Sequence, residues 1–220
     1  MTERQMVMHM KKRYDMMFAM VLFITALLLV IPSTHHTFFD FTNRYVLFGG
    51  FLKFFLFASL GDIFSYRIRF TSYHVPGLLR KMGVWGFIGI IIVIVFEIFP
   101  AGVDALNMNG IIPHGSNAVM RALYISVLMN LLFAPAMMLF HRITDAMIEL
   151  HVKSKHYQFN AALDTIDYPA FVKMLLKTIP LFWIPAHTIT FLLPEMYRAF
   201  FASILGVMLG LFLNLFKKSK

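Results

Sequence analysis

Long apolar runs recur along the whole chain and are separated by short polar segments. The runs cover residues 16–31, 45–66, 82–99, 122–141, 170–193 and 196–216. A helix rises about 1.5 Å per residue, so about 20 apolar residues cross the roughly 30 Å hydrocarbon core of a bilayer. The pattern therefore predicts an all-α integral membrane protein with about six transmembrane helices in one bundle, a single domain over residues 1–220.

The distribution of basic residues supports this number of spans. Lysine and arginine gather before the first run, between the second and third, between the fourth and fifth, and after the sixth. The remaining loops hold few of them, as expected for loops on the outer side of a membrane. Both termini are therefore expected on the inner side. No small-residue cleavage site follows Ile31, so the first run is expected to be an uncleaved span rather than a signal peptide.

Two of the runs give weaker signals than the others. The third is short and is expected to end before Pro100. The fifth contains Pro180 and Pro185, which predict a kink because proline lacks the N–H group that a helix interior requires. Such a kink is tolerated in a membrane where neighbouring helices or water satisfy the freed carbonyl groups.

The overall composition agrees with this class of protein. Hydrophobic residues make up 59% of the 220 residues and charged residues 14%, and the mean hydropathy is +0.72. So few polar groups cannot cover a water-facing surface. The formal net charge is +9. Because the basic residues lie at helix ends, we interpret them as anchors to anionic lipid and not as a nucleic-acid site. The chain has no cysteine, which excludes disulfides and thiol catalysis.

Small residues recur at helical spacing in three of the runs. In the third run they are Gly83, Gly86 and Gly89, and in the second Gly50 and Gly61 share a face. In the last run they form, with one amide, a stripe at every fourth position: Ala202, Gly206, Gly210 and Asn214. Small residues let membrane helices approach closely, so we expect these faces to serve helix packing.

Two charged residues fall within the second run. Lys53 and Asp62 are nine positions apart, which places them on opposite faces of a helix. Lys53 either snorkels to the interface or is buried for a function, and both interpretations remain open. Asp62 is expected near the inner interface, where Arg67 and Arg69 are candidate partners.

A line of polar and small residues follows one side of the fourth run. On a regular helix it falls within about 100° and consists of Ser126, Asn130, Ala134, Met137, His141 and Asp145. Such a line faces either a water-filled path or the polar groups of another helix. In the fifth run a second face carries Trp183, His187, Thr190 and Pro194. His187 is a candidate for proton coupling, although a single histidine with satisfied hydrogen bonds is the commoner case.

No pattern of catalytic or metal-binding residues appears. His35 and His36 lie near Asp40, but adjacent histidines point apart and no HExxH spacing is present. Phosphate loops, nucleophile elbows and dinucleotide fingerprints are also missing. We therefore expect no enzyme activity, no metal and no cofactor.

Three segments resemble motifs of one known family. The first is the sequence Leu60-Gly61-Asp62-Ile63-Phe64-Ser65. The second segment has matching residues at Arg121, Pro135, Phe140, His141 and Asp145, and the third at Trp183, Pro185, His187, Thr190, Phe191, Pro194 and Arg198. Together they resemble the family of peroxisomal membrane protein two and the mitochondrial Mpv-seventeen protein. The similar region covers about residues 45–66 and 121–220. Ala134 replaces a glycine of the family, and His187 and Thr190 replace a glutamine and an asparagine.

The resemblance implies a small multi-pass protein of an organelle membrane. The family is proposed to form channels for small solutes or to maintain metabolite and nucleotide homeostasis. It is usually drawn with four spans, so the run at 16–31 and the run at 82–99 would be additions.

The function expected from the sequence is a channel or permease for small metabolites, with anions favoured by the basic inner rim. Its path would be lined by Ser126, Asn130, Ala134, Pro135, His141, Asp145, Trp183, His187 and Thr190. One alternative is a proton-coupled exporter of amino-acid-like solutes that uses Lys53, Asp62 and His187. Another is a membrane scaffold that transports nothing. The expected location is a bacterial cytoplasmic membrane or an organelle membrane, mitochondrial inner or peroxisomal, and the partners are lipid, a small solute and further copies of the chain.

Overall fold

The computed structural model describes residues 15–20, 22–25, 27, 30–113 and 117–217, with side chains except those of residues 69 and 210–217. Over this part of the chain the regular structure is helical throughout and includes no strand. The chain divides into two compact units, Met1–Tyr45 and Val46–Lys220. The predicted all-α class is confirmed for the described residues.

The first unit contains helix α2 (Pro32–Arg44), where the sequence predicted an outer loop. The loop prediction was wrong because Pro32 stands in the first turn of the helix, where no N–H group is needed and its fixed φ suits the helix. The hydroxyl of Thr37 also donates a hydrogen bond to the carbonyl of Ser33, inside the helix. Within the first expected span, residues 21, 26, 28 and 29 lie outside the described residues. A short apolar helix is found over Asp15–Thr25.

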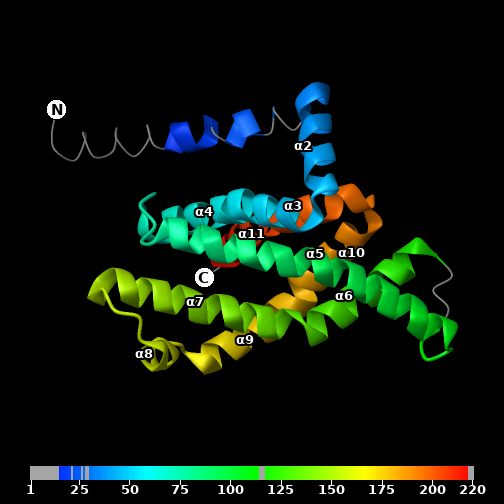
Figure 1. Cartoon of the computed structure of the whole chain (residues 1–220). Coiled ribbons are helices and arrows are strands. Elements are labelled where there is room, and N and C mark those ends of the chain that lie inside the picture. Colours follow the sequence, from blue (N-terminus) through cyan, green and yellow to red (C-terminus); the bar gives the residue numbers. More distant parts are fainter. Residues whose placement is uncertain (1–14, 21, 26, 28–29, 114–116, 218–220) are drawn as a thin grey trace. The chain divides into compact units, whose positions relative to one another are not determined.

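The second unit is a set of helices joined by short turns (Figure 1). In chain order they are α3 (Val46–Lys53), η1 (Phe54–Ala58), α4 (Ser59–Phe70), α5 (Leu78–Met108), α6 (Ala118–Leu132), α7 (Ala134–Ser154), α8 (Phe159–Asp164), α9 (Tyr168–Thr178), η2 (Ile179–Trp183), α10 (Ile184–Leu192) and α11 (Glu195–Lys217). The segments η1 and η2 are single π-helical turns within longer helices.

Within the described residues, three continuous helical stretches are long and apolar enough to cross a membrane: Val46–Ile68, Leu78–Met108 and Tyr168–Leu192. The pair Ala118–Leu132 and Ala134–Ser154, bent by 47°, makes a fourth if it counts as one span. These helices support the predicted transmembrane character. The number of six spans and the inner position of both termini stay predictions.

The third expected span is longer than the sequence indicated. Helix α5 runs from Leu78 to Met108 and passes through Pro100, so an end at Phe99 was wrong. One proline costs a single intrahelical hydrogen bond, and the helix beyond it is held by tertiary contacts. Val103 is buried, and Asp104 forms an ion pair with Arg121 of α6.

The fourth expected span is not one regular helix. Helix α6 ends at Leu132, and α7 begins at Ala134 after a break at Phe133. Pro135 explains the break, because its ring clashes with the carbonyl of the residue four positions earlier and it offers no N–H group. Pro135 therefore lies in the first turn of α7, where proline is well tolerated.

The glycine faces serve close helix packing at several of the expected positions. A Cβ atom on Gly50 of α3 would lie 2.7 Å from the carbonyl oxygen of Gly89 of α5, so these two helices cross with backbones in contact. A Cβ atom on Gly61 of α4 would lie 3.0 Å from the backbone nitrogen of Val207 of α11. A Cβ atom on Gly83 or Gly206 would instead meet open space.

The apolar core of the second unit lies between η1, α5, α6, α10 and α11. Ala202 of the predicted stripe belongs to this core, as does Phe191 of α10. The surroundings of Gly210 and of the Asn214 side chain, at the other end of the stripe, are not among the described features.

Candidate functional site

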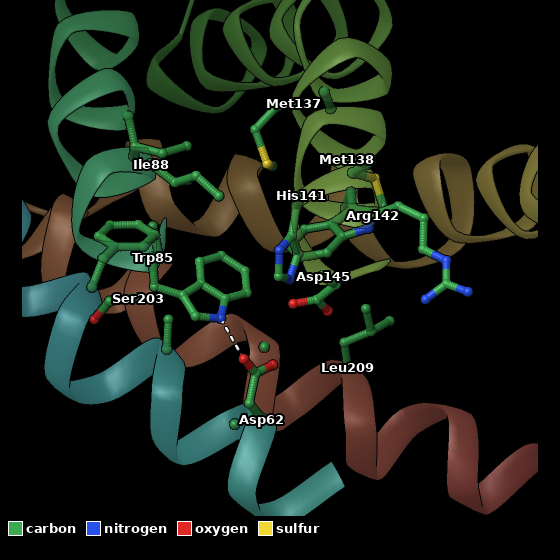
Figure 2. Close-up of a pocket in the computed structure, with 18 of the residues that line it drawn as sticks. Asp62, Trp85, Ile88, Met137, Met138, His141, Arg142, Asp145, Ser203 and Leu209 are labelled. Carbon is green, nitrogen blue, oxygen red and sulfur yellow. Dashed lines mark hydrogen bonds between the residues drawn. The ribbon is translucent and has the colours of Figure 1, made fainter. Parts of the chain in front are cut away.

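A cavity of about 300 Å³ lies between the helices of the second unit. Segments η1, α4, α5, α6, α7, α9, η2, α10 and α11 all contribute to its wall. Six of the residues predicted to line a path or to carry a charge within the membrane are in its wall: Asp62, Ala134, His141, Asp145, Trp183 and His187. Figure 2 shows the part of the wall around Asp62, with His141 and Asp145 on the helix opposite. The structure thus brings together residues that the sequence separates by more than a hundred positions.

The first half of the polar line on the fourth span does not face this cavity. Ser126 Oγ donates a hydrogen bond of 2.7 Å to the carbonyl oxygen of Ile184, and Asn130 Nδ2 donates one of 2.8 Å to the carbonyl oxygen of Ser126. Nδ1 of His187 lies 3.1 Å from Nδ2 and 3.2 Å from Oδ1 of Asn130. All three polar side chains are buried. For Ser126 and Asn130 the interhelical alternative is therefore the observed one.

His187 and Thr190 are held within the same packed region. The ring of His187 stacks on that of Trp183, with centroids 5.5 Å apart and planes 18° apart. The hydroxyl of Thr190 donates a 2.9 Å hydrogen bond to the carbonyl oxygen of Ala186, one turn back along α10. Thr190 does not line the cavity, whereas Trp183 and His187 do.

The second half of the polar line belongs to α7 and borders the cavity. Ala134, Met137, His141 and Asp145 all line it. The bend at Phe133 separates these residues from Ser126 and Asn130, so the line does not continue across the membrane on one face. Pro135 is not part of the wall, but it determines where α7 starts.

Asp62 pairs with a residue that the sequence did not indicate. Its Oδ2 accepts a hydrogen bond of 2.7 Å from Trp85 Nε1 of α5. The pairing with Arg67 or Arg69 stays a prediction, because the side chain of Arg69 lies outside the described residues. The Trp85 ring packs against His141, with centroids 4.2 Å apart. Figure 2 shows the dashed bond from Trp85 to Asp62 beneath His141. A tryptophan within an apolar run was the available signal, since its N–H group needs a partner when buried.

Lys81 also takes a place that the sequence did not assign to it. It was expected in an inner loop, but it lies in the first turns of α5 with a side chain only 9% exposed. Its Nζ is 3.3 Å from Oδ1 of Asp145 and 3.2 Å from Oε1 of Glu149. Because Asp145 and Glu149 are four positions apart on α7, they share a face. This ion pair joins α5 to α7 beside the cavity.

Three buried polar atoms of wall residues have no hydrogen-bond partner among the described residues. They are Nδ1 of His141, Nε1 of Trp183 and Oδ1 of Asp145, and the last of these is within ion-pair distance of Lys81. Buried polar groups are rarely left unpaired in a protein, because an unmade hydrogen bond costs free energy. Their presence in one wall distinguishes the cavity from the fully bonded cluster around Asn130.

Lys53 lies away from the cavity wall. The residue is only 2% exposed, so its side chain is buried and does not snorkel to the interface. It ends α3 immediately before the π-helical turn η1.

Two arginines of the segments that resemble the family form hydrogen bonds near the ends of helices. Arg121 of α6 donates two hydrogen bonds of 2.7 Å to the carboxylate of Asp104 of α5. Arg198 of α11 donates a 3.1 Å bond to the carbonyl oxygen of Leu193, where α10 ends, and lies over the ring of Phe191. The contacts of both residues are therefore structural.

Comparison of the chain with models of known protein families, with curated proteins and with solved structures found no match.

Proposed function

We propose that the protein is a permease for small metabolites and that the cavity between its helices holds the solute. The observation that carries this proposal is the cavity itself, about 300 Å³ in volume, with ionisable and aromatic groups in one wall. That volume is at the lower end of the range for small-molecule sites. Membership of the family of peroxisomal membrane protein two and the Mpv-seventeen protein is part of the proposal, and residues from all three family-like segments line the cavity: Asp62, His141, Asp145, Trp183 and His187.

Irregular helices around the cavity support a transport function. The π-helical turn η1 contributes Phe54 and Ala58 to the wall, and η2 contributes Trp183. The break between α6 and α7 contributes Phe133. Non-regular backbone at membrane depth is tolerated where it is covered by protein or lines a cavity, and π-helical turns are frequent at functional sites. These three places also allow the helices to bend differently when a solute enters or leaves.

A carrier is favoured over an open channel. An open channel needs a polar path along the whole span, and the hydrogen bonds of Ser126 and Asn130 close one half of the predicted line. A solute would therefore remain bound in the cavity until the helices rearrange. The host membrane in this proposal is a bacterial cytoplasmic membrane or an organelle membrane.

The second candidate is a proton-coupled exporter, and Asp62 is the observation in its favour. It places a carboxyl group in the cavity wall, where a proton and a solute can compete for it. His187 is a weaker candidate for carrying the proton than the sequence indicated, because its Nδ1 is hydrogen-bonded to Asn130. An imposed pH gradient across proteoliposomes tests this candidate: solute flux that ignores the gradient argues against it.

The experiment for the main proposal is solute flux through purified protein in liposomes. A phenylalanine at Gly206 would extend into the cavity, since Gly206 lines it and its Cβ position is open. Gly83→Phe is the matched control, because its Cβ position is also open but Gly83 is not in the wall. We expect Gly206→Phe to abolish flux and Gly83→Phe to retain it. Absence of flux in the unchanged protein, with a partner that co-purifies in fixed ratio, would favour the scaffold alternative.

A further inference from the structure

Asp62 has an unusual environment for a carboxyl group within a membrane protein. Its hydrogen bond comes from the neutral N–H group of Trp85, and within the described residues it forms no ion pair at 4 Å or less. A buried carboxylate without a cation is costly, so a positive partner would stabilise it strongly. Asp62 lies in the cavity wall, where such a partner has room.

Within the described residues, the other charged groups of the wall form no ion pair with Asp62. Asp145 is already engaged by Lys81, whose Nζ lies 3.3 Å from it. Arg142 is an exposed residue, and Figure 2 shows its guanidinium directed away from Asp62. The region of the wall around Asp62 is therefore acidic, in contrast to the basic inner rim from which the sequence predicted a preference for anions.

The rest of the wall suits the body of an organic molecule. It contains the aromatic side chains of Phe54, Trp85, Phe133, Phe171 and Trp183. It also contains the methionines Met129, Met137, Met138 and Met174. The faces of aromatic rings attract cations, most strongly that of tryptophan, and methionine adapts to ligands of different shape.

From these three observations we infer that the solute is a small organic cation, an amine with an apolar or aromatic body. Its ammonium group binds the Asp62 carboxylate next to the Trp85 ring, and its body lies among the aromatic and methionine side chains. This inference rests on the proposed function, because it names the class of solute for the same cavity. An anion of the same size would meet the Asp62 carboxylate, which has no ion-paired cation among the described residues.

The test measures protection of a single cysteine in the purified full chain. The native chain has no cysteine, so Ser65→Cys introduces a single thiol. Ser65 is exposed, lines the cavity and lies three positions after Asp62, on the same face of α4. Its rate of reaction with N-ethylmaleimide is measured with 2-phenylethylamine, 2-phenylethanol or 3-phenylpropionate, which share an apolar body and differ in charge. At about ten times its Kd the amine should slow labelling about tenfold, and the other two compounds should leave the rate unchanged.

Two further variants assign the effect to the carboxylate. Asp62→Asn keeps an acceptor for Trp85 but removes the charge, so we expect the protection by the amine to disappear. Glu97→Gln removes a carboxylate from an exposed position on α5 outside the cavity, and protection should be unchanged. If Asp62→Asn does not fold, the comparison of the three compounds on the Ser65→Cys protein still tests whether the cavity prefers a cation.

Equal protection by the alcohol, stronger protection by the carboxylate, or no protection by any compound would each overturn the inference. Protection that survives in a folded Asp62→Asn protein would overturn the role of Asp62. The outcome is separable from that of the transport test. Protection by the amine without flux in liposomes would contradict the proposed permease function and would still support the cation site. Flux without protection would contradict only the inference that the solute is a cation.

Discussion

The two halves of the polar line on the fourth span differ in what surrounds them. On α6, Ser126 and Asn130 are completely buried and bonded to the fifth span, through Ile184 and His187. On α7, His141 and Asp145 border a cavity, and Nδ1 of His141 has no partner. The bend of 47° between the two helices separates these environments. One half of a single sequence pattern therefore serves packing, and the other half forms a candidate site.

Each half is tied to a different neighbour. Hydrogen bonds join the α6 half to α10, whereas the ion pair of Lys81 joins the α7 half to α5. Among the described residues, the hydrogen-bonded half has no buried side-chain nitrogen or oxygen without a partner. The α7 half combines the ion pair of Asp145 with the unpaired Nδ1 of His141, an arrangement suited to binding a solute.

The largest expected effect on stability comes from removing the ion pair that joins the α7 half to α5. Lys81→Gln leaves Asp145 without its cation, and removing one partner of a buried ion pair costs about 3 kcal/mol. The free energy of unfolding in detergent, from denaturant titration, measures this loss. Arg121→Gln is the control, because the side chains of its pair with Asp104 are 39% and 49% exposed and the pair should contribute less than about 1 kcal/mol. Equal losses in the two variants would contradict the difference in burial.

A smaller loss is expected from the hydrogen-bonded half. His187→Phe keeps a ring against Trp183 but leaves the Asn130 amide without that partner, which should lower the free energy of unfolding by about 2 kcal/mol. The same titration measures it. A variant as stable as the unchanged protein would show that the bond between the fourth and fifth spans contributes little.

The matched change in the cavity half should have the smallest effect. His141→Phe keeps the ring beside Trp85 and loses no hydrogen bond, so stability should change by no more than about 0.5 kcal/mol. Comparison of the two histidine variants under the same conditions checks the contrast directly. A loss as large as that of His187→Phe would mean that His141 has a structural partner.

Much of the fold follows from hydropathy alone. The second and fifth runs, predicted at 45–66 and 170–193, correspond to the stretches Val46–Ile68 and Tyr168–Leu192. The glycines at positions 50, 61 and 89 were correctly expected to pack helices together. These features depend on one helix at a time or on small side chains, and both are visible in a linear sequence.

The effects of single prolines were harder to predict. Pro100 was expected to end a helix, and α5 continues through it because Val103 and Asp104 find partners beyond it. Pro135 was placed within a span and instead begins a new helix. The local cost of proline is similar in the two cases, so packing against neighbouring helices decides the outcome.

The candidate site was predicted in part. His141, Asp145, Trp183 and Asp62 were identified as polar or aromatic groups at membrane depth, and all four line one cavity. Trp85 and Lys81 were missed, because each acts through a partner on another helix. Periodicity indicates which face of a helix a residue occupies but not which helix lies opposite.

The most direct test of the division at Phe133 is the reaction of single cysteines with a water-soluble thiol reagent in membranes. Cysteines replace Ser126 in the bonded half, Ala134 and His141 in the cavity half, and exposed Lys153 as a control. We expect the Ala134 and His141 variants to react as the control does, and the Ser126 variant to stay unlabelled. Labelling of the Ser126 variant at the rate of the His141 variant, or no labelling of either cavity variant while the control reacts, would contradict the account.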